Sequence, residues 1–108
     1  MTVKELSERL HLQPLVMAEP DREVTGGYVG DLLSWVMGNA QCGDAWVTIM
    51  SNSNIVAVAT LADTAAVILA EGVEPDSGVR ELAEQKGINL FSTSESAFSV
   101  CGRLAALL

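Results

Sequence analysis

The run Thr25-Gly26-Gly27 is the part of this sequence whose residue types best suit a small ligand. The apolar spacing from Tyr28 to Met37 predicts a helix, so the two glycines would directly precede its first turn. Backbone N–H groups at a helix start have no intrahelical acceptor, and the helix dipole favours negative charge there. We therefore predict a site for a small anion at this helix start, with the Thr25 hydroxyl as a cap or a ligand contact.

Two polar side chains of the same predicted helix extend this candidate site. Asp31 and Ser34 are three residues apart, so they would lie on one helix face. The candidate ligand-binding residues are Thr25, Gly26, Gly27, Asp31 and Ser34. The alternative interpretation is that the glycines only provide a positive-φ turn and close packing, with Asp31 solvated. Both interpretations stay open at this point.

Recognisable catalytic signatures are missing from the chain. It has no GxxxxGK[ST] phosphate loop and no GxSxG nucleophile elbow, and the spacing GGxxG at residues 26–30 is not the GxGxxG dinucleotide fingerprint. The single histidine, His11, has no Cys or Asp nearby in the sequence as a partner for catalysis or metal binding. Asp21 and Glu23 lie in an acidic loop, which suits solvated carboxylates. We predict no catalytic residue, no metal and no cofactor, and keep an enzyme of unrecognised type as a third hypothesis.

The charge balance restricts the partners. The 108 residues include 14 acidic and 6 basic ones, a formal net charge of −8. Such a chain repels phosphate backbones and anionic membranes, so we expect no nucleic-acid and no membrane partner. The charge also serves solubility. The most apolar stretch, residues 45–70, is interrupted by polar residues at 51–54 and at 63–64, so it does not predict a membrane span.

The cysteines and the N-terminal residues indicate the compartment. Cys42 and Cys101 lie far apart with no CxxC pair, which favours free thiols in a reducing environment. Residues 1–5 carry charge at amphipathic spacing instead of the apolar core of a signal peptide. We expect a cytoplasmic protein.

Strand-length and helix-length patterns alternate along the chain. This alternation predicts an α/β fold with three layers, in which a mostly parallel sheet has helices on both faces and residues 1–108 form a single domain. The predicted strands are 15–18, 45–49, 65–69 and 88–92, and the predicted helices begin at a Thr2/Glu5 capping box, at Tyr28, at Asn54, near Pro75 and at a Ser92/Glu95 capping box.

Residues 54–62 have two interpretations. Their length and the strand pattern that follows favour a helix, whereas the run Ile55–Val58 also suits a central strand. As a helix the segment would be apolar nearly all round, so it would need cover on both sides. A second copy of so small a domain could provide the outer cover. We therefore predict a homodimer with Ile55, Val56, Val58 and Ala59 at the interface.

The candidate site also carries a family resemblance. Asp21-Arg22 followed by Thr25-Gly26-Gly27 resembles the motif that names the DRTGG domain family, although Glu23 and Val24 intervene. Residues 28–34, 43–48, 54–59 and 71–75 are similar to its continuation, so the resemblance covers most of the chain from about residue 14 onward.

The resemblance implies an α/β fold like the N-terminal domain of HPr kinase and a non-catalytic role. Domains of this family accompany phosphate acetyltransferases and CBS-domain pyrophosphatases as accessory or regulatory parts. We therefore expect a regulatory module that binds a small anionic ligand, with a nucleotide as one candidate, and that communicates with an unknown protein partner through dimerisation. The alternative is a protein–protein assembly module without a ligand.

Overall fold

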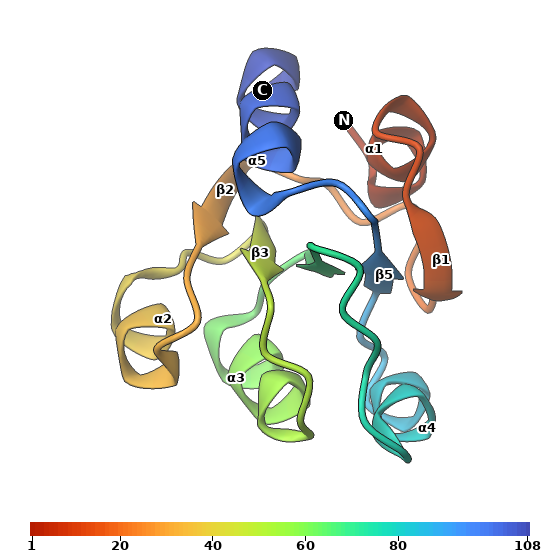
Figure 1. The fold of residues 1–108 in the computed structure, drawn as a ribbon, viewed down its shortest axis with the longest axis vertical. Helices are drawn as coiled ribbons and strands as arrows, with labels where there is room; N and C mark the ends of the chain where they lie inside the picture. The colour runs from red at the N-terminus through yellow and green to blue at the C-terminus, as the bar shows by residue number, and fades with distance from the viewer.

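A five-stranded sheet with helices on both faces makes up the molecule (Figure 1). The computed structural model describes residues 1–108. In chain order the elements are α1 (Val3–Arg9), β1 (Gln13–Val16), β2 (Gly26–Val29), α2 (Leu33–Asn39), β3 (Asp44–Thr48), α3 (Asn54–Ala62), β4 (Ala66–Leu69), α4 (Val79–Gln85), β5 (Leu90–Ser92) and α5 (Ala97–Leu107).

The strand order in the sheet is β1-β5-β4-β3-β2. Strands β2, β3, β4 and β5 are parallel, and β1 is antiparallel to β5 at one edge. Helices α2, α3 and α4 connect successive parallel strands, as crossover connections must. The predicted α/β class, with a mostly parallel sheet between helical layers, is confirmed.

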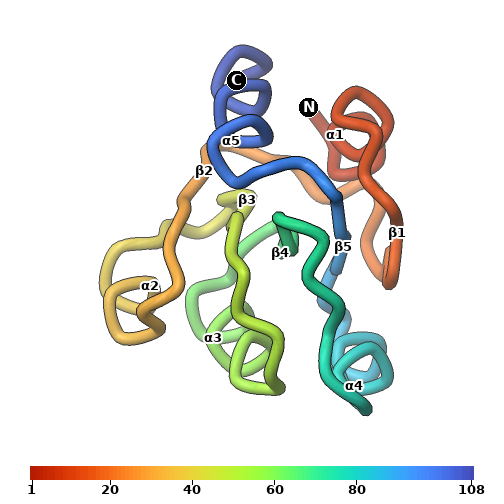
Figure 2. Tube along the Cα trace, in the orientation of Figure 1, coloured from red at the N-terminus to blue at the C-terminus, as the bar shows by residue number.

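The two faces of the sheet have separate hydrophobic cores. Helices α1 and α5 cover one face, and α2, α3 and α4 cover the other; both chain ends lie on the α1/α5 side (Figure 2). Every residue of β3 and β4 is buried, which explains why their sequences are almost uninterrupted apolar runs. The largest fully buried side chains include Trp46 and Phe91.

Local signals located some helices correctly. The Thr2 hydroxyl accepts from the Glu5 backbone N–H at 3.1 Å, and the Glu5 carboxylate accepts from the Thr2 N–H at 3.0 Å, so the predicted capping box is confirmed. The hydrogen bond from the Thr2 backbone N–H to the carboxylate is the main cause that lowers the pKa of Glu5. Helix α3 has the predicted bounds, Asn54–Ala62, and ends at Asp63, which takes the left-handed conformation (φ 56°).

The predicted helix from Tyr28 to Met37 is wrong. Residues 26–29 form strand β2, and the helix begins only at Leu33. Glycine is a poor helix former, and pairing with β3 gives the backbone of residues 26–29 a full set of partners on one side. Asp31 fixes the turn that follows, because its carboxylate accepts from the Thr48 hydroxyl at 2.8 Å and from the Ile49 N–H at 2.9 Å.

The last helix also begins later than predicted. Ser92 belongs to β5 and pairs with Gln13 and Leu69, so it cannot cap a helix. The cap is Ser96, whose hydroxyl accepts from the Ser99 N–H at 3.1 Å.

The predicted interface residues are core residues. Ile55, Val56, Val58 and Ala59 are between 0% and 4% exposed within the single chain. They pack in the core that α2, α3 and α4 form with the sheet, so their own chain already covers them. The residues named for a dimer interface are therefore wrong, while the homodimer itself stays a prediction.

Candidate functional site

The five predicted ligand residues do not form one site. Thr25, Gly26 and Gly27 lie at the amino end of β2, whereas Asp31 and Ser34 follow its carboxyl end. Because a strand rises by about 3.3 Å per residue, the four residues of β2 alone separate the two groups by roughly 10 Å. No helix begins at residues 26–27, so the anion prediction there loses the backbone donors and the dipole on which it rested.

The two glycines of β2 allow close packing. A Cβ atom on Gly26 would lie 2.7 Å from a carboxylate oxygen of Asp44, and one on Gly27 would lie 3.0 Å from a methyl carbon of Leu104 in α5. Asp44 is 6% exposed and accepts from the Gln41 N–H at 2.8 Å. A buried carboxylate beside Gly26 disfavours an anion at that point. The geometry fits the packing interpretation of these glycines.

Arg22 and Asp63 form the centre of a polar cluster at the amino ends of the strands. One guanidinium nitrogen of Arg22 lies 3.0 Å from Asp63 Oδ1, and the other donates to the Asp63 carbonyl at 2.7 Å. The Cys42 thiol donates to Asp63 Oδ2 at 3.1 Å. Three segments are joined here: the loop before β2, the loop before β3 and the end of α3.

The cluster shifts two pKa values in opposite directions. The hydrogen bond from Cys42, followed by the hydrogen bond and charge of Arg22, lowers the pKa of Asp63. The hydrogen bond to Asp63 and its negative charge raise the pKa of Cys42. The Cys42 thiol is therefore protonated at neutral pH, which makes it a poor nucleophile and a poor metal ligand.

A polar cavity of about 110 Å³ lies beside this cluster. Its polar lining combines two cationic side chains, Arg22 and Lys86, with the buried Asn89; Lys86 forms no ion pair. Thr64 also lines the cavity, is 5% exposed, and has the single buried side-chain polar atom without a hydrogen-bond partner. Such an atom is costly unless something bonds to it. Glu19, Thr60 and Asp63 complete the polar part of the lining.

A second hollow of about 310 Å³ lies between β2 and α5. Most of its lining is apolar, so it does not suit an anion. It is lined by Gly26, Gly27, Tyr28, Val29, Cys101, Leu104, Ala105 and Leu108. The sequence predicts a polar site at the two glycines, whereas the structure places them in this apolar groove.

The remaining candidates do not come together. No three His, Cys, Asp or Glu side chains lie close enough to hold a metal ion. Cys42 and Cys101 are both free thiols. None of the helices is both long enough and apolar enough to span a bilayer.

Comparison with known families identifies the fold of residues 33–107, which match the DRTGG domain model. The chain belongs to the DRTGG domain family. The matched range starts after residues 21–27, so the motif resemblance noted in the sequence lies outside it. Strands β1 and β2 nevertheless belong to the same sheet as the matched part, and α1 packs in one of its two cores.

Solved structures include a similar regulatory region. The chain superposes on the crystal structure of the CBS and DRTGG domains of the regulatory region of Clostridium perfringens pyrophosphatase, complexed with its activator diadenosine tetraphosphate, with a TM-score of 0.74 and 16% sequence identity. The similarity covers 95% of this chain and 45% of the chain in that crystal structure, so the present chain spans less than half of that regulatory region. A comparison with curated protein sequences gives no significant match.

Proposed function

We propose that residues 1–108 act as one non-catalytic regulatory module in the cytoplasm, which binds a small anionic ligand and dimerises. The observation that carries the proposal is family membership: a DRTGG domain accounts for most of the chain. Its fold is that of a regulatory region whose pyrophosphatase is activated by diadenosine tetraphosphate. Nucleotides are therefore the first ligand candidates.

The cavity beside Arg22 and Lys86 is the best location for the charged group of such a ligand. Lys86 is a cation without an ion-pair partner, and the Thr64 hydroxyl lacks a hydrogen-bond partner. A phosphate group supplies both the negative charge and the acceptor oxygens that these groups lack. The volume of about 110 Å³ suits one phosphate group, so the remainder of a nucleotide would extend over the surface outside the cavity.

No local sequence pattern predicts this cavity, for a physical reason. Arg22, Thr64 and Lys86 belong to no common motif and are brought together only by the packing of three separate loops. Lys86 follows α4, and Thr64 follows α3. The available signal was weak: a lysine and a threonine that each lie just before a strand of a parallel sheet.

A titration with a matched variant tests the ligand and its location together. We expect AMP, ATP or diadenosine tetraphosphate to give saturable binding by calorimetry, and Lys86→Ala to weaken it by about tenfold because one charge-assisted contact is lost. Arg9→Ala removes one positive charge from the exposed end of α1 on the other face of the sheet and should leave the affinity unchanged. NMR shift mapping with the same ligands distinguishes the cavity from Thr25, Gly26, Gly27, Asp31 and Ser34.

Two results would count against the ligand. Equal losses in Lys86→Ala and Arg9→Ala would indicate only a long-range charge effect. No saturation with any of these nucleotides or with inorganic phosphate would favour the second candidate, an assembly module without a ligand. The apolar groove between β2 and α5 is the observation that favours this alternative.

A further inference from the structure

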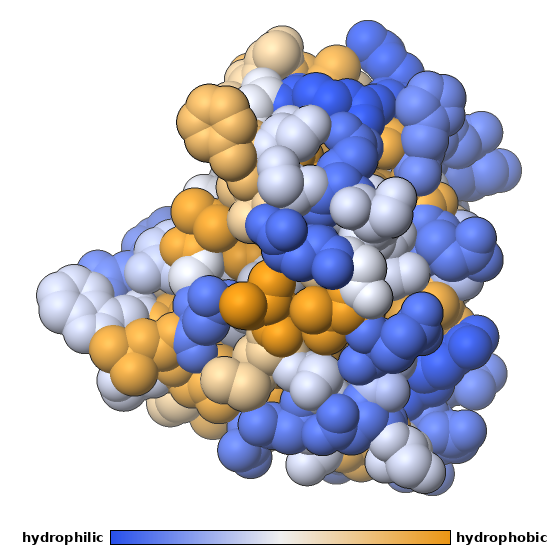
Figure 3. Space-filling view, viewed as in Figure 1, coloured by the Kyte–Doolittle hydropathy of each residue, from blue (hydrophilic) through white to orange (hydrophobic).

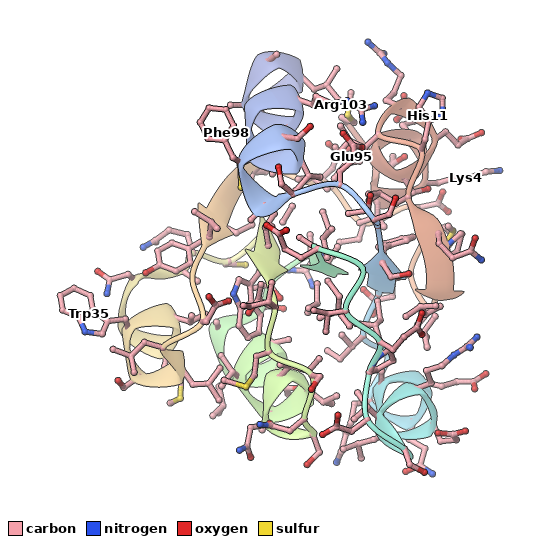
Figure 4. The ribbon with its side chains drawn as sticks, viewed as in Figure 1. Lys4, His11, Trp35, Glu95, Phe98 and Arg103 are labelled. Atoms are coloured by element: carbon pink, nitrogen blue, oxygen red, sulfur yellow. The ribbon has the colours of Figure 1, made fainter.

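Exposed hydrophobic side chains gather around strand β2. Phe98 is 91% exposed and Trp35 is 62% exposed, although both are large aromatic residues. Figure 4 shows both side chains pointing outward from the same side of the molecule, Phe98 from α5 and Trp35 from α2. We call this region the β2 flank and define it by Val29, Leu32, Trp35, Met37, Phe98 and Leu108, each at least 49% exposed.

Helix α5 contributes a continuous stripe to the β2 flank. Phe98, Cys101, Ala105 and Leu108 recur at helical spacing, so they lie on one face of the helix. The last three of them line the groove against Val29 of β2. The stripe therefore connects Phe98 to the strand and makes the exposed apolar surface contiguous across two elements. Contiguous apolar surface of this kind marks an interaction site.

Strand β2 adds unpaired backbone groups to the same surface. It is an edge strand, hydrogen-bonded only to β3, so one side of its backbone is open. Natural edges are commonly protected by charged side chains, proline or a covering element. β2 has the sequence Gly-Gly-Tyr-Val and carries no charge and no proline. The opposite edge strand, β1, contains Pro14 and is protected in that way.

The charge distribution restricts what can cover the β2 flank. Between Gly26 and Ala40 the only charged residue is Asp31, and α5 contains only Arg103. Arg103 is turned toward α1, where it pairs with Glu95 and donates to the Arg9 carbonyl at 3.2 Å. In Figure 3 the side of the molecule around β1 is mostly hydrophilic, whereas hydrophobic residues recur along the side of β2. Two copies with a net charge of −8 repel each other, and this nearly uncharged surface is where they can approach.

We propose that a second copy of this chain covers the β2 flank. The inference rests on the dimerisation part of the proposed function and is independent of its ligand. The two β2 strands would run antiparallel across a two-fold axis perpendicular to the sheet, which extends the sheet from one copy to the other. This axis places α5 beside α5 on one face and α2 beside α2 on the other, so Phe98 and Trp35 both face the partner.

The area available is sufficient for a stable dimer. A standard interface buries about 800 Å² per partner. Aromatic side chains bury about 150–250 Å² each, so the exposed parts of Phe98 and Trp35 alone supply on the order of 300 Å². Val29, Leu32 and Leu108 add aliphatic surface around them. Aromatic anchors are also the residues that most often dominate interface energies.

Sedimentation equilibrium with charge-introducing variants tests the interface. We expect a dimer for the wild type, and we expect Phe98→Asp or Trp35→Asp to raise its dissociation constant by about thirtyfold or more. Leu61→Asp is the matched control, because Leu61 is 70% exposed but lies on α3, away from the β2 flank. It should leave the dimer intact. Thermal unfolding verifies that the variants fold, and Phe98→Ser replaces Phe98→Asp if the latter does not.

The contrary results are equally specific. A wild type that stays monomeric up to about 100 µM would overturn the proposal, because an interface of standard size associates well below that concentration. A dimer that Leu61→Asp disrupts but Phe98→Asp and Trp35→Asp do not would place the interface on α3 instead. Nucleotide titration of a monomeric Phe98→Asp or Trp35→Asp variant separates the ligand proposal from the dimer proposal. If such a variant still binds nucleotide, the ligand function holds independently of the dimer.

Discussion

Asp63 connects three parts of the chain through one side chain and one carbonyl. It ends α3 in the left-handed conformation, pairs with Arg22 from the loop before β2, and accepts from the Cys42 thiol in the loop before β3. Aspartate tolerates this backbone conformation better than most residues do, and its carboxylate has enough acceptor sites for both donors. The cluster therefore positions the amino ends of the parallel strands, where the candidate cavity lies.

Asp63→Asn should make Cys42 more reactive. The substitution removes the carboxylate whose hydrogen bond and negative charge raise the pKa of the thiol, while Arg22, which lowers it, remains. More thiolate is then present at pH 8, and we expect alkylation by iodoacetamide to be about two- to tenfold faster. The measurement uses a Cys101→Ser background, so that Cys42 is the single thiol. Equal rates with and without Asp63 would show that the carboxylate does not control this thiol.

The same variant has a defined pH dependence. The pKa of Asp63 is lower in the folded protein than its ordinary value of 3.8, so the ionised carboxylate stabilises the folded state. This stability is fully present above pH 4 and is lost as the pH falls through the folded pKa. Wild type should therefore unfold at a higher temperature than Asp63→Asn at pH 7, and the difference should vanish in more acidic buffer. A difference that persists unchanged at low pH would point to packing instead of charge.

At the scale of single elements, α5 depends on Ser96, the N-cap residue directly before its first turn. Ser96 caps the helix through its hydroxyl, and α5 in turn covers Gly27 and one side of the sheet. Without the cap, the Ser99 N–H loses its acceptor at the first turn. The start of α5 also determines which residues reach the core and which reach the β2 flank.

Ser96→Ala should destabilise the domain by about 1 kcal/mol, the usual cost of losing an N-cap. Ser94→Ala is the control, since Ser94 is an exposed residue in the preceding loop. It should change the free energy of unfolding by less than about 0.5 kcal/mol. Urea denaturation of both variants measures the difference, and equal effects of the two substitutions would argue against the cap.

Elements were predictable where local and tertiary preferences agree. Strands β3 and β4 are apolar runs buried on both faces, and α3 has a helical length between them, so sequence and structure coincide. At Tyr28, Leu32 and Val36 the spacing suits a helix equally well as it suits a strand followed by a turn. The pairing of residues 26–29 with β3 favours the strand over the helix, and no local sequence pattern indicates that pairing. The interface prediction failed similarly, because the four residues named for it pack inward against the sheet, α2 and α4.

The candidate site was less predictable than the fold. Thr25, Gly26 and Gly27 were the residues that local patterns emphasised, yet the glycines serve the packing of β2 against Asp44 and α5. The cavity takes its cations from residues 64 positions apart in the chain, Arg22 and Lys86. Arg22 and Lys86 come together only because of the order of the strands in the sheet. No local pattern in the sequence reports that order.

The whole molecule is polar and acidic over much of its surface and nearly uncharged at the β2 flank. The net charge of −8 acts over the full surface, whereas the apolar side chains that are exposed lie mainly around one edge of the sheet. Charge therefore keeps copies apart in most orientations and leaves one orientation open. Because the β2 flank is nearly uncharged and the rest of the surface is acidic, the salt dependence of dimerisation shows which surface forms the interface.

Raising the NaCl concentration from about 20 mM to about 500 mM should lower the dissociation constant of the dimer by about three- to tenfold. Salt screens the repulsion between two acidic copies and leaves the apolar contact unaffected. Sedimentation equilibrium at both concentrations measures the dissociation constant. Leu61→Lys and Leu61→Asp add one charge of either sign at an exposed position outside the interface, so the salt effect should be smaller in the first and larger in the second. An interface built on ion pairs would behave in the opposite way and would weaken as salt is added, which would exclude the β2 flank as the contact surface.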